Sequence, residues 1–311
     1  MSEAVDVLVI GPGAMGCLHA ALLREAGISV GLLDHRARRA ELIDGRGILV
    51  ERDDGEHTVP VPCSAEPAAF RTSELAIVFV KAYDTEEATR RALPAIGESA
   101  SVLTLQNGLG NHELIGEIVP PARVLAGTTT TGATLLGDGH VREAGRGFIQ
   151  LGSPSGNSRR TREALAILER AGLDCESTPS VEEVLWAKAI VNAAINPLTA
   201  LTGLRNGMMV EIPQLREQLQ DVVRESAAVA RAEGVFVRED VVQLVEGICE
   251  RTGHNRSSML QDVSAGRRTE IDVINGEIAR RGESRGVAAP LCRMLTALVH
   301  GRERGGESGD R

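Results

Sequence analysis

The chain has 311 residues, a formal net charge of −9 and only 2% aromatic residues, and its length favours two ordinary domains. The negative charge and the shortage of aromatic rings disfavour binding to nucleic-acid phosphates or stacked bases. Because the five cysteines form no CxxC pair, the histidines lack metal-ligand spacing, and no signal peptide or apolar run of ~20 residues is present, we expect a cytoplasmic protein with no metal site and no membrane span.

The first half of the chain alternates apolar strands with helices, which indicates a doubly wound, mostly parallel sheet of the Rossmann type. A strand at residues 5–10 runs into a glycine-rich loop, a helix at 14–26 and a second strand at 30–33. Helices are predicted at 36–44, 85–93 and 159–171, a hairpin around 53–55, and further strands at 75–80, 101–105, 123–129, 147–151 and 173–177. We place a dinucleotide-binding domain at residues 1–178.

The loop after the first strand has the spacing of a dinucleotide-binding turn. Gly11 is expected to make the tight turn, Gly13 to let a pyrophosphate approach the backbone, and Gly16 to let helix and strand pack closely. Free N–H groups at the helix start, including those of Ala14 and Met15, favour phosphate. A glycine-rich turn without a ligand is the alternative interpretation.

The residues after the second strand bear on the choice of cofactor. Asp34 lies about 20 residues beyond the glycine loop, where an acid normally binds the ribose 2′-hydroxyl and favours NAD. Arg36 follows almost at once, and an arginine there can bind the 2′-phosphate of NADP. For Arg38 and Arg39 a solvated helix face is the simpler interpretation. These residues alone leave NAD and NADP both open.

The second half of the chain shows almost no strand pattern and is expected to be all-helical. The change of composition lies near residues 178–180, and we place a helical substrate and catalytic domain at 179–300. Its predicted helices span 181–201, 213–233, 238–252, 257–281 and 288–300. The polar, glycine-rich tail at 301–311 is expected to be disordered.

Lysine is almost absent from this chain, because Lys81 and Lys188 are the only two among 34 basic residues. Lysine can release a proton when its pKa is lowered, whereas arginine effectively cannot. Lys188, Asn192 and Asn196 follow at i, i+4 and i+8 in an apolar helix, so they share one face. Asparagine is a poor helix former, which favours polar groups aimed into a site. A narrow solvent-facing edge, or a helix end at Pro197, is the alternative.

Taken together, these segments resemble the ketopantoate reductase (2-dehydropantoate 2-reductase) family. The matching stretches run in the family's order over roughly residues 5–280, and only the glycine loop is generic. They are Gly-Pro-Gly-Ala-Met-Gly at 11–16, Val-Lys-Ala at 80–82, Leu-Gln-Asn-Gly-Leu-Gly at 105–110, the helix from Lys188 to Ala200, Ser-Ser-Met-Leu-Gln-Asp at 257–262, Thr-Glu-Ile-Asp at 269–272 and Ile-Asn-Gly at 274–276.

The resemblance implies an enzyme that reduces 2-dehydropantoate to (R)-pantoate with NADPH, in pantothenate and coenzyme A biosynthesis, at a cleft between the two domains. It makes Lys188 the catalytic lysine and Glu270 the acid that hydrogen-bonds the substrate hydroxyl. Positions matching substrate contacts are Asn192, Asn196, Asn255 and Ser258, and those matching cofactor contacts are Lys81 and Asn107. Many relatives carry Arg after the second strand, where this chain has Asp34-His35-Arg36, so NAD is an alternative to NADP.

The residues suit this chemistry, because an ammonium can stabilise the alkoxide left by hydride transfer and then protonate it. Two alternatives stay open. One is a related reductase that acts on another small 2-oxo acid. The other is a regulator that binds NAD(P)H without turnover. An exposed apolar helix face could make a homodimer.

Overall fold

The computed structural model describes residues 2–307, and its internal contacts divide the chain into two units. The first unit runs up to Gln106 and resumes at Asn111–Val184; the second comprises Asn107–Gly110 and the chain from Leu185 onward. The division falls inside one long helix, slightly later than the boundary predicted after residue 178. The four-residue segment at 107–110 belongs to the second unit by its contacts, although its sequence neighbours belong to the first.

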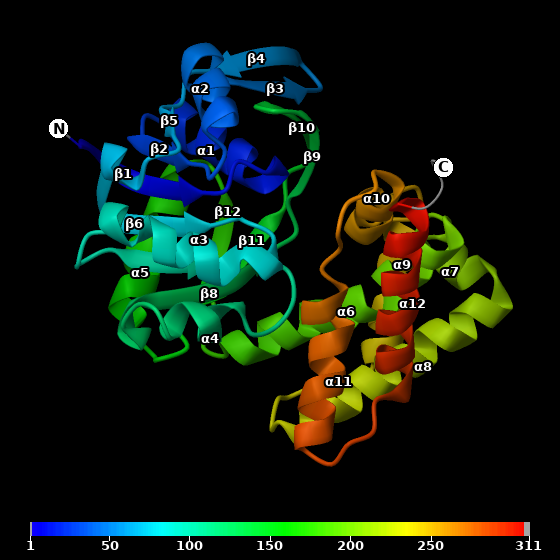
Figure 1. The fold of residues 1–311 in the computed structure, drawn as a ribbon. Coiled ribbons are helices and arrows are strands. Elements are labelled where there is room, and N and C mark those ends of the chain that lie inside the picture. The colour runs from blue at the N-terminus through cyan, green and yellow to red at the C-terminus, as the bar shows by residue number, and fades with distance from the viewer. Residues whose placement is uncertain (1, 308–311) are drawn as a thin grey trace. The chain divides into compact units, whose positions relative to one another are not determined.

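The first unit is built on an eight-stranded sheet, which confirms the predicted doubly wound fold (Figure 1). Strand β1 (Glu3–Ile10) lies between β2 (Val30–Leu33) and β6 (Phe70–Val78) and is parallel to both. Later strands are added on both sides of β1, so the strand order reverses there. Such a switch point opens a ligand crevice at the carboxyl ends of the strands. The remaining strands are β5 (Cys63–Ser64), β7 (Ser101–Thr104), β8 (Val124–Thr129), β11 (Phe148–Gly152) and β12 (Asp174–Ser177). In this sheet, the pair of β8 and β11 is antiparallel.

Helices cover both faces of this sheet and form a separate apolar core on each. The helices are α1 (Ala14–Glu25), α2 (Ala37–Arg46), α3 (Thr85–Ala92), α4 (Asn111–Gly116) and α5 (Ser158–Arg170), with 3₁₀ turns η1 (Pro67–Ala69), η2 (Ala82–Asp84), η3 (Leu93–Ala95) and η4 (Pro121–Arg123). Leu18 of α1 and Leu168 of α5 belong to one core. Ala92 of α3 and Ile115 of α4 belong to the other. Burial on both faces explains why these strands read as continuous apolar runs.

A second sheet, of four strands, packs against α1 (Figure 1). It contains the predicted hairpin, β3 (Ile48–Arg52) and β4 (Gly55–Val59). It also contains β9 (Gly132–Gly137) and β10 (His140–Gly145), which the sequence did not predict. Strand β10 pairs with β3, about 90 residues earlier in the chain. The turn between β9 and β10 is thereby brought close to the end of β2.

The second unit is helical, as predicted. It contains α6 (Val181–Thr202), α7 (Met208–Glu211), α8 (Pro213–Ala232), α9 (Val241–Arg251), α10 (Ser258–Ser264), η5 (Ile271–Val273), α11 (Asn275–Ser284) and α12 (Pro290–Glu307). The single helix predicted over 257–281 is wrong. Helix α10 ends at Ser264, and Gly266 follows with a positive φ of 62°. This break creates the irregular segment that carries Glu270.

The tail differs from the sequence-based expectation as well. The disorder predicted for residues 301–311 is wrong for 301–307, which continue α12 to Glu307. Glutamate and arginine in this stretch favour helix, and the preceding helix removes the nucleation penalty. Residues 308–311 lie outside the described part of the chain.

Helix α6 is the one helix within residues 2–307 that is long and apolar enough to cross a membrane by length and composition. Helix α6 is not a continuous run of apolar residues, because Lys188 and two asparagines interrupt it. Of its most apolar 18-residue window, 67% is buried inside the protein. That burial is typical of a core helix, which is how α6 behaves in the second unit.

Candidate active site

The glycine loop between β1 and α1 shows three different uses of glycine. Gly11 has a positive φ of 101°, which side-chain-bearing residues rarely adopt. A Cβ at Gly16 would lie 1.9 Å from the carbonyl oxygen of Gly11, so only glycine lets helix and loop pack this closely. At Gly13 a Cβ would meet no atom nearer than Phe79 O at 4.0 Å. The fold does not itself require glycine at 13, and the open face there fits the approach of a ligand.

The start of α1 is suited to an anion. Gly13 is its N-cap and supplies no side-chain hydrogen bond, and the first turn carries no acidic residue. The N–H groups of the first turn therefore keep their capacity to bind a ligand, and the helix dipole favours negative charge. Ala14 and Met15 in that turn are half-buried. The loop and this helix end together fit the diphosphate of a dinucleotide.

Asp34, at the end of β2, is buried and fully engaged. Its Oδ1 accepts hydrogen bonds from the backbone N–H groups of His35 (2.7 Å) and Arg36 (3.2 Å), and both carboxylate oxygens bind the guanidinium of Arg39. Burial alone would raise the pKa of Asp34, but Arg39 and the two N–H groups outweigh it and hold the pKa below its usual value. The solvated helix face suggested for Arg39 is therefore wrong, whereas Arg38 is exposed.

Arg36 and Lys81 also lie at the carboxyl edge of the large sheet. The Arg36 guanidinium binds Asp138, in the turn between β9 and β10, at 2.9 Å, and about half of its side chain is exposed. Lys81 is half-buried and precedes η2, just after β6. Nearby, the Gln106 amide donates to the carbonyl of Val80 (2.7 Å), which ties the ends of β6 and β7 together. The structure thus brings the predicted cofactor residues Asp34, Arg36 and Lys81 to one edge of the first unit.

In the second unit, α6 runs without interruption past Lys188, Asn192 and Asn196, so the three lie on one helix face. Lys188 and Asn192 are half-buried and Asn196 is buried. Burial lowers the pKa of Lys188 to about 8, and the charge of Glu270 raises it in part. Within residues 2–307 the two asparagine amides make no hydrogen bond, so their polar groups are available to a ligand. A solvent-facing stripe would not show this burial.

Glu270 lies in the segment before η5 and is 8% exposed. Its Oε2 accepts a hydrogen bond from the Asn107 amide at 3.3 Å. The turn carrying Asn107 is held against η5, because Leu109 N–H donates to the carbonyl of Val273 (2.9 Å) and a Cβ at Gly108 would clash with that carbonyl. Asn107, predicted to face the cofactor, thus contacts the predicted acid.

Asn255 and Ser258, the remaining predicted substrate residues, are exposed at the start of α10. Ser257 is the N-cap of α10 and accepts a hydrogen bond from Leu260 N–H (3.0 Å). Its hydroxyl also lies 2.7 Å from that of Thr199 in α6. This buried contact ties the start of α10 to α6, so all the predicted substrate residues belong to one connected part of the second unit.

Comparison with known proteins decides the family. The family model for the ketopantoate reductase PanE/ApbA matches residues 7–156, and its C-terminal counterpart matches 180–303. A 2-dehydropantoate 2-reductase of Halobacterium salinarum is 38% identical over 302 residues, covering 96% of this chain and 99% of that protein. One of Archaeoglobus fulgidus is 37% identical over 300 residues, covering 96% and 98%. This chain belongs to the ketopantoate reductase family.

Solved structures agree with this family assignment. A ketopantoate reductase of Ralstonia eutropha matches with a TM-score of 0.88 and 34% identity, covering 98% of this chain and all of that one. A D-mandelate dehydrogenase with NADH and anilino(oxo)acetate matches with a TM-score of 0.92 and 28% identity, covering 98% and 100%. One fold in this group therefore serves proteins named for different 2-oxo or 2-hydroxy acids.

Asn275 supports helix α6, although the sequence did not indicate this role. Pro197 lies inside α6 and has no N–H, so the carbonyl of Ala193, four residues earlier, lacks its helical donor. The amide of Asn275, at the start of α11, donates to that carbonyl at 3.0 Å. A proline in the middle of a helix was the available signal, and it predicts a missing donor without saying which residue replaces it.

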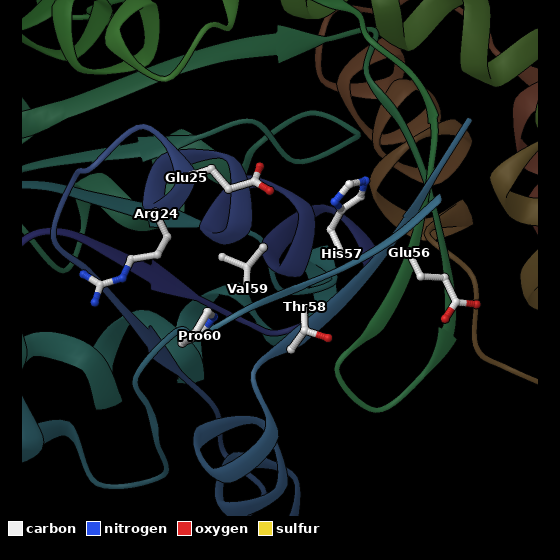
Figure 2. Close-up of a pocket in the computed structure, with 7 residues that line it drawn as sticks. All are labelled: Arg24, Glu25, Glu56, His57, Thr58, Val59 and Pro60. Carbon is white, nitrogen blue, oxygen red and sulfur yellow. The ribbon is translucent and has the colours of Figure 1, made fainter. Parts of the chain in front are cut away.

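The hollow in Figure 2 lies elsewhere on the first unit. It has a volume of about 570 Å³ and is lined by Arg24 and Glu25 of α1 and by residues 56–60 of β4 and beyond. None of the predicted site residues lines it. Within the described part of the chain, no group of three or more His, Cys, Asp or Glu residues is arranged to hold a metal ion.

Proposed function

We propose that this chain reduces 2-dehydropantoate to (R)-pantoate with NADPH, the step its family supplies to pantothenate and coenzyme A biosynthesis. The observation that carries the proposal is the pairing of Lys188 with Glu270 in the second unit. A half-buried amine whose pKa is lowered to about 8 can hold a proton near neutral pH and also release it. The family membership supports the interpretation of this pair as part of an active site rather than as an internal ion pair.

The proposed roles follow from the chemistry of each group. The bound cofactor supplies a hydride to the keto carbon. Lys188 stabilises the negative charge that develops on the oxygen and donates the proton that makes the hydroxyl. Glu270, an acceptor held by Asn107, binds that hydroxyl and keeps Lys188 charged.

The proposed substrate is a small anion, and most of the side chains proposed to orient it are neutral hydrogen-bond donors. Asn192 and Asn196 offer amides without other partners inside the described chain, and they orient the substrate without adding charge. Asn255 and Ser258, at the start of α10, are proposed to bind its polar groups, with Ser258 near the carboxylate. In this proposal the positive charge that meets the substrate is the ammonium of Lys188.

Cofactor binding is proposed for Gly11, Gly13, Ala14, Met15, Gly16, Asp34, Arg36, Lys81 and Asn107. For the adenosine end, an unpaired carboxylate at Asp34 would repel a 2′-phosphate. Arg39 neutralises that carboxylate, and Arg36, which is paired with Asp138, presents a half-exposed guanidinium nearby in the chain. This arrangement supports NADPH as the preferred cofactor while NADH is also accepted.

A second candidate is reduction of another 2-oxo acid with NADH. Two observations favour it: an acid does end β2, and the structure with a TM-score of 0.92 is a D-mandelate dehydrogenase with NADH. A regulator without turnover is disfavoured, because binding a cofactor does not require a half-buried lysine and a buried glutamate whose charges interact in the other unit.

A panel of 2-oxo acids assayed with NADPH and with NADH decides between these candidates. We expect the highest kcat/KM for 2-dehydropantoate with NADPH. A higher kcat/KM for an aryl or branched 2-oxo acid with NADH would establish the second candidate. Tight cofactor binding with no oxidation of either cofactor by any acid would establish the regulator.

We further propose a cytoplasmic enzyme that forms a homodimer. Met294 and Leu298, one turn apart on α12, are about half exposed and give the second unit an apolar strip. Analytical ultracentrifugation checks this, with a single species at twice the chain mass expected.

A further inference from the structure

The segment that carries Glu270 is held by the C-terminal helix through two polar contacts. The N–H of Thr269, the residue before Glu270, donates to Oε1 of Glu303 at 2.7 Å. Two residues after Glu270, Asp272 accepts from His300 at 2.8 Å. Glu303 and His300 lie three residues apart on α12, so one face of that helix holds both sides of the proposed acid.

Other polar contacts also hold this segment, among them Arg268 to Asp272 at 3.2 Å and the Asn107 amide to Glu270 at 3.3 Å. It lies between the end of α10 at Ser264 and η5 at Ile271, where the chain has no regular hydrogen-bond ladder. Thr269 is 1% exposed, so its N–H must find a partner inside the protein or lose roughly 1–3 kcal/mol. The partner it finds is an ionised side chain, which forms a shorter and stronger bond than a neutral carbonyl.

We propose that Glu303 is a positioning residue for the Glu270 carboxylate. Through Thr269 N–H it sets the backbone from which Glu270 projects, and so sets the distance from Glu270 to Lys188 and to the substrate hydroxyl. Misplacing a catalytic group by about 1 Å can lower a rate up to about 100-fold. This inference rests on the proposed reduction, because it gives Glu303 a purpose in that reaction.

The surroundings of Glu303 make it testable by substitution. It lines a hollow of about 410 Å³ together with Arg268, Arg304 and His300. When the carboxylate is removed, water can enter this polar hollow and satisfy the Thr269 N–H, so the chain folds without the fixed partner. A glutamine at 303 keeps a carbonyl oxygen that can accept from Thr269.

The experiment compares Glu303→Ala and Glu303→Gln with Arg302→Ala, a control at an exposed neighbour on the same helix. Measured are kcat and KM with 2-dehydropantoate and NADPH, the Kd of NADPH, and amide hydrogen exchange at Thr269. We expect Glu303→Ala to lower kcat at least tenfold, to leave the Kd of NADPH unchanged and to speed Thr269 exchange at least tenfold. Glu303→Gln should recover most of both, and Arg302→Ala should match wild type.

Three outcomes would overturn the proposal: unchanged Thr269 exchange in Glu303→Ala, faster exchange with unchanged kcat, or an equal loss of kcat in Arg302→Ala. Failure of the proposed reaction looks different. In that case the wild-type protein itself does not reduce 2-dehydropantoate, while Thr269 exchange still depends on Glu303, and the same variants are assayed with whichever 2-oxo acid the wild type reduces.

Discussion

The two units prepare for their ligands in opposite ways. In the first unit, the glycine loop depends on the absence of side chains, because Gly13 leaves an open face and Gly16 lets α1 approach the loop. In the second, the proposed site consists of side chains that project from a mostly buried apolar helix, with Lys188 and Asn196 as examples. The first arrangement is local in sequence, whereas the second depends on tethers from distant helices.

This difference teaches where each unit is vulnerable. A backbone site is damaged by adding atoms, since its donors are main-chain N–H groups that only a substitution to proline removes. A side-chain site is damaged by removing atoms or by loosening the segments that aim them. The chain's two lysines, one in each unit, allow the comparison to be made with the same substitution.

The largest effect is expected for Lys188→Arg. Arginine keeps the charge but cannot donate the proton, so kcat should fall about 10²–10⁴-fold, the usual contribution of a general acid. The Kd of NADPH, measured by fluorescence titration, should stay the same. Lys81→Arg is the matched substitution in the first unit and should raise the KM for the cofactor with little change in kcat. Near-normal turnover of Lys188→Arg would remove this lysine from the chemistry.

Alanine substitutions at Gly16 and Gly13 sharpen the comparison within the glycine loop. Gly16→Ala forces a Cβ against the Gly11 carbonyl, so we expect a loss of about 3 kcal/mol in the free energy of unfolding. Gly13 has φ −77° and open space, so Gly13→Ala should fold normally. Its Kd for the cofactor should rise about tenfold or more, equivalent to ~1.4 kcal/mol. Urea unfolding and cofactor titration of both variants test this; equal destabilisation by the two would contradict it.

The same contrast explains what the sequence could predict. The βαβ unit, the glycine loop and the helix from 181 are local patterns, and the structure has them within a few residues of the predicted bounds. Strand β10 was missed because it pairs with β3, far earlier in the chain, and polar residues blur its alternation. The helix predicted over 257–281 was wrong because the apolar periodicity continues across Gly266, whereas the helix ends just before this glycine.

The site shows a similar limit. The lysine–asparagine stripe on α6 was visible as a helical spacing, whereas the role of the Thr-Glu-Ile-Asp stretch was implied only by the family resemblance. The groups that hold them in place were not visible, because Asn275 binds a backbone carbonyl of α6 and Glu303 binds a backbone N–H of the irregular segment before η5. A hydrogen bond from a side chain to a distant main-chain group leaves no periodic trace in the sequence.

A double-mutant cycle between Asn275 and Pro197 tests one such tether. Asn275→Ala leaves the buried carbonyl of Ala193 without a donor, so it should lower the free energy of unfolding by about 2 kcal/mol. In a Pro197→Ala background the new N–H at position 197 bonds that carbonyl, so the same substitution should have a clearly smaller effect. Urea denaturation of the four proteins measures this. An identical loss in both backgrounds would show that Asn275 stabilises the fold by another contact.

The smallest expected effect is a shift in the pH profile. Lys188 must be protonated to act as the acid, so kcat for reduction should be constant at low pH and fall as pH rises through about 8, the value to which burial lowers its pKa. The charge of Glu270 raises that pKa, so Glu270→Gln should move the falling limb to lower pH by about one unit. Asn107→Ala is the control, because it removes a hydrogen bond to the same carboxylate without removing its charge, and its limb should stay near that of wild type. A limb that stays in place in Glu270→Gln would mean that a group other than Lys188 titrates there, and the second unit would then hold its proton donor elsewhere.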